Sequence, residues 1–293
     1  MERTMRKQAI TSVGLFLICA LTSGAAGAKD VPLDKVLGAD PKALDPDQLA
    51  AAKSIMQAEK VYFGCKDTIA SCLAGEKESM TARRLAGMVV RKVKAGHDAA
   101  AIHDMIEKRG LSMHPIKTYE VSIDKAPSTG SDSPTVEVAA FSDFQCPFCK
   151  AILPRLEKIS GKLAGVRLYF KHFPVKKHKD APLAAVASLA AHGQGKFWPF
   201  HDLCYEDPDH LEKDDLVAKA KQAGVEDLAR FEKDLGSKDL MKAVESDKIE
   251  GLKLGVKGTP TIYIDGKLYL GETSYEDLVD VLSEEIDLAA GKK

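Results

Sequence analysis

The chain has 293 residues, of which 45% are hydrophobic and 29% are charged, so it holds enough apolar material for one or two globular domains. Lys and Arg number 42 against 43 for Asp and Glu, and this balance excludes the basic field that nucleic-acid binding requires. Six cysteines are too few for a disulfide-packed miniprotein but enough for a redox or metal site.

Residues 1–28 predict a cleaved secretory signal. The start is basic, with Arg3, Arg6 and Lys7, and residues 9–21 form an apolar run. Small residues follow up to Ala28, after which we expect cleavage. The apolar run is short for a membrane span, which disfavours an uncleaved anchor. We therefore expect a periplasmic protein that keeps five cysteines where disulfides persist.

Residues 29–124 are predicted to form a helical N-terminal region. Helices are expected from Asp45-Pro46, over residues 79–95, and from an N-cap at Asp98 to a stop at Gly110. The alternation of residues 117–124 predicts a strand. Residues 125–133 are polar and turn-rich, and we expect them to be a linker.

Residues 134–290 predict a second domain in which strands and helices alternate. Its expected elements are a buried strand at 135–141, a helix at 147–163, a strand at 165–173, helices across 180–254 with breaks near Gly193-Gly195, Pro208, Gly224 and Gly236, a hairpin of 261–265 and 267–270, and a helix at 274–288. The order is β-α-β, a helical insert, then β-β-α. This order predicts an α/β fold preceded by a small all-α region.

The motif Cys146-Pro147-Phe148-Cys149 lies between the first strand and the helix that follows it. At a helix N-terminus, free N–H groups and the helix dipole favour an anion, which lowers the pKa of Cys146 and populates its thiolate. Pro147 is well placed there because its missing N–H costs nothing. Cys149 lies one turn further on, within bonding reach. The spacing predicts a couple in which Cys146 attacks and Cys149 resolves the mixed disulfide.

A bare CxxC motif also fits a structural or metal-binding role. A zinc site would need a second ligand pair at similar spacing, which the sequence lacks. Thiolates suit Cu(I), but no Met cluster or His pair supports copper handling. We therefore predict redox chemistry with no metal and no cofactor.

A second motif, Gly258-Thr259-Pro260, precedes the hairpin. Together with Phe141–Cys149, Phe173-Pro174 and Gln194–Asp202, it resembles the DsbA-like branch of the thioredoxin-fold thiol–disulfide oxidoreductases over residues 134–288. The resemblance implies a thioredoxin-like fold with a helical insertion. It also implies that Cys146 is the exposed nucleophile, Cys149 the resolving thiol and Pro260 a cis-proline facing them. A bound substrate would pair with the Thr259 backbone as an added strand and contact Pro147 and Phe148.

Three positions shape the expected potential. Strong oxidases of the branch carry His where this chain has Phe148, and many relatives carry a buried acid where it has Ala140. Both differences predict a weaker oxidant than the branch's strong members. Thr259 instead of Val resembles the isomerase-like members.

Residues 60–115 weakly resemble the small helical domain of CcmH-type haem-lyase thioreductases, with six residues between Cys65 and Cys72 instead of the two of a CxxC. We expect a structural disulfide between them, since export favours pairing. A second exchange couple that relays electrons to Cys146 and Cys149 is the alternative. For the whole block, a dimerisation or spacer module stays open.

Cys204 and the basic run 171–179 are expected to have no part in the exchange chemistry, with one alternative for each. Cys204, near Trp198 and Phe200, is expected to be a buried, inert thiol, with intermolecular pairing as the alternative. The basic run 171–179 is expected to be a solvated loop, or, if it lies near Cys146, to favour the thiolate.

The sequence therefore predicts an exported thiol–disulfide oxidoreductase. Its expected partners are exported proteins with thiols or disulfides and a membrane protein that resets the couple. The enzymatic alternative is a reductase or isomerase linked to cytochrome c maturation, and the non-enzymatic one is a Cu(I)-handling protein.

Overall fold

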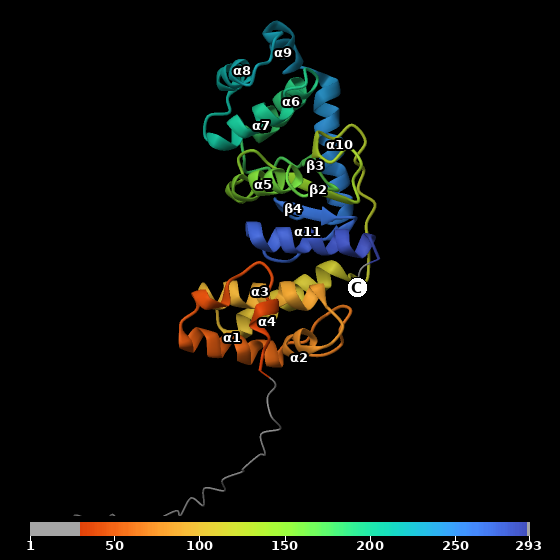
Figure 1. The fold of residues 1–293 in the computed structure, drawn as a ribbon. Coiled ribbons are helices and arrows are strands. Elements are labelled where there is room, and N and C mark those ends of the chain that lie inside the picture. Colours follow the sequence, from red (N-terminus) through yellow and green to blue (C-terminus); the bar gives the residue numbers. More distant parts are fainter. Residues whose placement is uncertain (1–29, 292–293) are drawn as a thin grey trace, which may run out of the picture.

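The computed structural model describes residues 30–291, and the predicted signal 1–28 lies outside them. The first part of the chain is helical, with two 3₁₀ turns (Leu33–Lys35 and Pro41–Ala43) and helices α1 (Pro46–Ala58), α2 (Ile69–Ala74), α3 (Met80–Lys94) and α4 (Ala99–Met113) (Figure 1). Asp45 caps α1 in a capping box with Gln48, and Asp98 caps α4 as expected. No helix within residues 30–291 is both long and apolar enough to cross a bilayer.

A five-stranded sheet forms the centre of the second part, in the order β1-β3-β2-β4-β5. Its strands are β1 (Ser128–Gly130), β2 (Val136–Ser142), β3 (Val166–His172), β4 (Thr261–Ile264) and β5 (Lys267–Leu268). Strands β2 and β3 are parallel, joined by α5 (Pro147–Ser160), and the other pairs are antiparallel. Asp265 and Gly266 both have positive φ, as the predicted tight turn between β4 and β5 requires.

The predicted helical insert separates β3 from β4. It comprises α6 (Ala181–His192), α7 (Phe197–Glu206), α8 (Lys213–Gln222), α9 (Leu228–Asp234) and α10 (Lys238–Leu254), and α11 (Tyr275–Ala289) closes the chain. The breaks fall where Gly and Pro were expected to end helices. The order β-α-β, insert, β-β-α is thus confirmed.

Strand β2 is buried on both faces. Val136, Val138 and Ala140 belong to the larger core with α5, α11 and the insert, whereas Ala139 and Phe141 face a smaller cluster with Phe173 and Tyr263. A Cβ at Gly251 of α10 would lie 2.8 Å from Phe173 and 3.1 Å from Phe141. Gly251 therefore lets α10 approach that face closely.

The predicted strand at 117–124 was wrong. The segment lies outside the sheet, and its backbone contacts the β4–β5 turn, where Tyr119 N donates to Gly266 O at 2.8 Å. Tyr119 and Val121 pack against the smaller cluster, while Glu120 and Ser122 are exposed. The alternation of apolar and polar residues thus arises because the segment packs on a sheet. A strand within a sheet shows the same period of two.

Two further boundaries differ from expectation. The segment 125–133 contains β1, which pairs with β3, so it is not a free linker. Helix α4 continues through Gly110 to Met113. A Cβ at Gly110 would lie 3.2 Å from the Tyr62 side chain, so this glycine makes room for packing instead of ending the helix.

The N-terminal helices lie against α11 (Figure 1). Ion pairs with buried members join the two. Arg109, whose side chain is 2% exposed, lies 2.9 Å from Glu284, which also accepts from Tyr62 and Thr81. The other pairs across this boundary, among the described residues, are Arg84–Asp287, Arg91–Asp277, Arg91–Asp280, Lys92–Asp277, Lys92–Glu272 and Arg109–Asp280. Buried charges need their partners, so this boundary fixes α11 against the N-terminal helices.

Candidate active site

The chain places Cys146 at the N-cap of α5, four residues after β2 ends at Ser142. Pro147 is the first helical residue, as expected. The Cys146 amide donates to Asp143 O at 3.1 Å, and Lys150 N donates to Cys146 O at 3.1 Å. The loop and the first helical turn thus hold the Cys146 backbone from both sides.

The surroundings of Cys146 favour its thiolate. The donor Cys149 thiol is the largest contribution, the Thr259 hydroxyl and the amides of Cys149 and Phe148 add to it, and burial opposes them. Together they lower the pKa of Cys146 to about 5. The two amides belong to the first helical turn, where N–H groups have no helical partner. Cys146 is therefore a thiolate at neutral pH, in its reduced state.

Cys149 has the opposite properties. Its side chain is fully buried, and burial together with the neighbouring Cys146 sulfur raises its pKa well above the ordinary value. The Asp143 amide and the Thr259 hydroxyl oppose this rise. Cys149 thus stays protonated while Cys146 is ionised, which is the difference that thiol–disulfide exchange requires between an attacking and a resolving thiol.

The expectation of an exposed nucleophile was wrong, because the Thr259 segment and the first turn of α5 bury Cys146. Cys146 is 5% exposed and Cys149 is 0% exposed, so Cys146 is the more accessible of the two sulfurs. The apolar surface beside it is Phe148, which is 69% exposed.

The second motif faces the first. The Thr259–Pro260 peptide bond is cis, as the resemblance implied. Antiparallel pairing of β4 with β2 sets Thr261 opposite Phe141, and Cys146 Sγ then lies 3.2 Å from Thr259 O. The sheet register therefore brings together residues that are 113 positions apart.

Sequence reasoning missed Asp143, whose carboxylate is fully buried. It accepts from Gln145 N at 2.7 Å, Val175 N at 2.6 Å and His178 Nδ1 at 2.8 Å. The bond from Gln145 N, two residues on, is an Asx turn, and an Asp just before CxxC is the signal that could have indicated it. Asp143 shapes the loop that presents Cys146.

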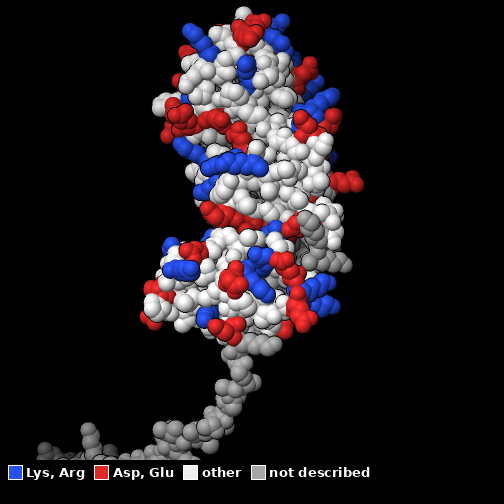
Figure 2. All heavy atoms as spheres, viewed as in Figure 1, with Lys and Arg blue, Asp and Glu red and all other residues white. Residues whose placement is uncertain are grey.

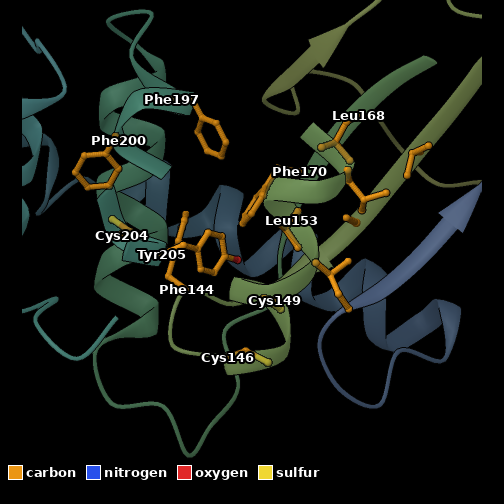
Figure 3. Packing of buried hydrophobic residues seen from close by; sticks show 14 of the residues in the cluster. Phe144, Cys146, Cys149, Leu153, Leu168, Phe170, Phe197, Phe200, Cys204 and Tyr205 are labelled. Atoms are coloured by element: carbon orange, nitrogen blue, oxygen red, sulfur yellow. The ribbon is translucent and has the colours of Figure 1, made fainter. Parts of the chain in front are cut away.

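Gln145 and Tyr205 were also missed, and both connect this loop to the insert. Gln145 Oε1 accepts from Asp180 N at 2.8 Å and Ala181 N at 3.0 Å, at the start of α6. Tyr205 of α7, 2% exposed, donates to Asp143 O at 3.3 Å. The packing that joins α7 to the sheet surrounds Tyr205 (Figure 3).

The basic run 171–179 is not a solvated loop throughout. Lys171 is 3% exposed and pairs with Asp247 and Glu250, because it lies in β3 under α10. His178 contacts Asp143 instead of the Cys146 sulfur. Strand burial, which a charge run conceals, explains the difference.

A Cys65–Cys72 disulfide is present, with the two Cα atoms 6.0 Å apart. A cavity of about 320 Å³ borders both residues. Cys204 is a fully buried free thiol whose pKa is raised by burial, which agrees with an inert role.

Within residues 30–291, Glu157, His201 and Asp202 bring potential metal-ligand atoms within 4.8 Å of one another. His201 Nδ1 lies 2.9 Å from Asp202 Oδ1. Burial and the Asp202 carboxylate raise the pKa of Glu157 to about 7, so a proton between the two carboxyls accounts for their closeness.

Comparisons with known proteins support the same region. A family model described as thioredoxin matches residues 123–284. A probable disulfide bond formation protein D of Bacillus cereus is 38% identical over 154 residues, covering 48% of this chain and 70% of that protein, and one of Bacillus anthracis is 32% identical over 171 residues, covering 54% and 77%. The solved structure of oxidised BdbD from Bacillus subtilis matches with a TM-score of 0.50 and 27% identity, covering 59% of this chain and 97% of that one.

Proposed function

This chain belongs to the thioredoxin family and is a thiol–disulfide oxidoreductase, and on that premise we propose that it forms disulfides in exported proteins through Cys146 and Cys149. The observation that carries the proposal is the placement of the couple: Cys146 caps α5 at 3.2 Å from Thr259 O, and Cys149 is fully buried one turn further on. These surroundings lower the pKa of Cys146 and raise that of Cys149. Such a pair separates the roles of attack and resolution. The relatives named for disulfide bond formation favour the oxidative direction.

In that direction, a substrate thiolate attacks Cys146 Sγ of the oxidised couple. The Cys146–Cys149 bond breaks, Cys149 leaves with the electron pair and is protonated, and a mixed disulfide remains on Cys146. A second substrate thiolate attacks the substrate sulfur of the mixed disulfide, and the Cys146 thiolate leaves. The low pKa of Cys146 makes it a good leaving group, so substrate release is favoured.

The substrate would lie along the Thr259 backbone. Thr259 precedes β4, and Thr259 O lies 3.2 Å from Cys146 Sγ. An extended peptide that pairs there would place its cysteine beside Cys146. Phe148, exposed at the rim, and Pro147 and Pro260 would supply apolar contact.

Export and the partners follow from the same premise. The basic start and apolar run of residues 1–28 would direct the chain to the periplasm, where a membrane redox protein would reoxidise the couple. Acidic and basic side chains are interspersed over the face shown in Figure 2, which supports protein substrates over nucleic acid.

The proposed domains are a signal (1–28), a helical region (29–124), a connecting segment (125–133) and a thioredoxin-like domain (134–290). The Cys65–Cys72 disulfide would be structural, since Cys72 is 4% exposed and its thiolate would be a poorly solvated leaving group. Dimerisation through the helical region stays a prediction.

Refolding of a reduced disulfide-containing protein tests the proposal. The oxidised protein, added in stoichiometric amounts, should restore the activity of the reduced substrate protein. A Cys146→Ser, Cys149→Ser double variant should not. Insulin reduction and the rescue of scrambled ribonuclease measure the other two directions. Failure to oxidise, with efficient insulin reduction, would reassign the protein as a reductase.

A further inference from the structure

Cys146 lies where a tight turn meets α5 (Figure 3). One residue, Asp143, holds that turn: Cys146 N donates to Asp143 O at 3.1 Å, and Gln145 N donates to the Asp143 carboxylate at 2.7 Å. The N–H groups on both sides of Gln145 are therefore bonded to Asp143. Because these bonds fix the backbone just before the Cys146 side chain, the position of the Asp143 carboxylate sets where Cys146 lies.

The Asp143 carboxylate in turn depends on His178. It is fully buried, and it lies 2.8 Å from His178 Nδ1. Within residues 30–291, the other donors to it are the backbone amides of Gln145 and Val175, so His178 supplies its one side-chain donor. A carboxylate only accepts, so His178 Nδ1 carries the proton of this bond. Without that donor, the carboxylate would keep the cost of its burial and lose part of what offsets it.

The segment that carries His178 is itself fixed. His178 N donates to Val175 O at 2.9 Å, and this turn directs the Val175 amide and the His178 ring at the same oxygen, Asp143 Oδ2. From the other side, Lys248 Nζ of α10 donates to Pro174 O at 2.7 Å. The loop after β3 thus gives the Asp143 carboxylate a fixed support.

The turn holds Cys146 in a place where a small displacement has a large effect. Cys146 is the N-cap residue of α5, and its sulfur lies 3.2 Å from Thr259 O. The influence of a helix N-terminus on an anion falls off within the first turn. A substrate strand that pairs with Thr259 also needs the sulfur at this point. Whatever fixes the turn therefore affects both the stability of the thiolate and its approach to a substrate sulfur.

We propose that His178 is a positioning residue for Cys146: by donating to the Asp143 carboxylate, it holds the turn that places the Cys146 sulfur beside Thr259 O. The inference rests on the proposed function. In the step that it serves, Cys146 Sγ gives an electron pair to one sulfur of a disulfide, the bond between the two sulfurs breaks, and the other sulfur leaves as a thiolate. His178 transfers no proton and touches none of the reacting atoms.

Two variants of similar size separate the hydrogen bond from the packing of the ring. His178→Leu removes the donor, whereas the side-chain amide nitrogen of His178→Asn can take the place of Nδ1. A symmetrical nitrobenzoate disulfide measures the step, because attack by Cys146 of the reduced protein releases a first coloured thiolate. Near pH 5, the midpoint for Cys146 in the wild type, this phase should slow roughly 2- to 10-fold in His178→Leu, as expected for a lost hydrogen bond.

Two further readouts follow the thiolate itself. In His178→Leu the midpoint of the pH profile of the first phase should move to higher pH, because the displaced thiolate is less stabilised. The reduction potential, measured by equilibration with glutathione, should fall for the same reason. His178→Asn should restore the rate, the midpoint and the potential. A merely structural role would lower the thermal stability of both variants without this pattern.

A matched control and a second background complete the experiment. His103→Leu removes another ring whose Nδ1 lies near a carboxylate, that of Glu59 at 3.0 Å in the helical N-terminal region, and it should change none of the three readouts. In an Asp143→Asn background, His178→Leu should have little further effect, because the ring then has no carboxylate to hold. Should His178→Leu not fold, His178→Gln, whose donor lies where Nε2 does, takes its place.

Three outcomes would overturn the proposal. The first is a His178→Leu variant with the wild-type rate and midpoint. The second is a His178→Asn variant that behaves like His178→Leu, which would assign the effect to the charge or the packing of the ring. The third is an effect of His178→Leu that persists in full beside Asp143→Asn. A wild-type protein that releases no coloured thiolate would instead contradict the proposed function itself.

Discussion

Cys146 Sγ lies 3.2 Å from the carbonyl oxygen of Thr259, a residue 113 positions further along the chain. The contact exists because β4 pairs with β2, so the segment before β4 faces the turn after β2. A substrate strand that pairs with Thr259 would have its sulfur delivered to Cys146. On the proposed function, the sheet register would thus couple peptide recognition to the exchange chemistry.

The Cys149→Ser variant should accumulate mixed disulfides with exported proteins, because Cys146 still attacks but nothing resolves the product. Cys146→Ser should accumulate none, since Cys149 is fully buried and protonated. Non-reducing gels of cells that express each variant make the comparison. Equal trapping by both variants would contradict the assigned roles.

The thiolate absorbance of reduced Cys146 should titrate with a midpoint near pH 5. Cys149→Ala should raise that midpoint, because the thiol it removes makes the largest contribution to the low pKa. A pKa lower in the folded than in the unfolded state stabilises the fold as pH rises. The reduced wild-type protein should therefore gain stability from about pH 5 towards pH 9 and lose it as the pH falls through 5. A thermal melt series that is flat across this range would count against the assignment.

Phe148→His should make the couple more oxidising, since a protonated imidazole beside Cys146 would stabilise its thiolate and hence the reduced form. Each ~1.4 kcal/mol of added stabilisation raises the potential by about 30 mV. Equilibration with glutathione measures the change. Phe148→Leu, which keeps an apolar side chain at this 69% exposed position, should leave the potential near the wild-type value. A histidine variant that does not differ from it would refute the explanation.

Replacing both Cys65 and Cys72 with Ala should lower the free energy of unfolding by about 2–3 kcal/mol, the loop-entropy value for a short closed loop. Oxidation of a substrate by Cys146 and Cys149 should persist at its normal rate, measured where the variant is folded. Loss of exchange with an intact fold would favour the electron relay instead.

Arg109→Met should destabilise the protein by about 3–5 kcal/mol, because it leaves the Glu284 carboxylate buried without its cation. The neighbouring Lys108→Met is the control: Lys108 pairs with Asp104 in an exposed i, i+4 bridge, so its loss should leave the urea midpoint close to the wild-type value. Urea titration gives both values. Similar midpoints for the two variants would show that the buried pair does not hold α11.

Much of the fold could be predicted, because the hydrophobic periodicity of each element ends where the sequence places capping residues, glycines or turn residues. Asp98 caps α4, Asp265-Gly266 turns the hairpin, and Gly193-Gly195 separates α6 from α7. The strand predicted at 117–124 was wrong because a segment that packs on a sheet and a strand within the sheet both have side chains that alternate with a period of two. The predicted end of α4 at Gly110 was wrong because the glycine makes room for the ring of Tyr62, which is distant in sequence.

The site was predictable where the chemistry is local. Cys146 at a helix start and Cys149 one turn later follow from spacing alone. Asp143, His178 and Tyr205 act only after three segments meet, and nothing in a run such as 171–179 distinguishes buried from exposed charge. Such residues become visible only through long-range contacts.

The ion pairs between the N-terminal helices and α11 determine whether the second domain can be produced as a separate fragment. A fragment that starts at Lys117 would bring Asp277, Asp280 and Glu284 into water without Arg91 or Arg109, while keeping the apolar side of the same helix. A minimal catalyst made from the thioredoxin-like domain alone would therefore need substitutions at these acidic positions of α11, because they are paired with the N-terminal helices.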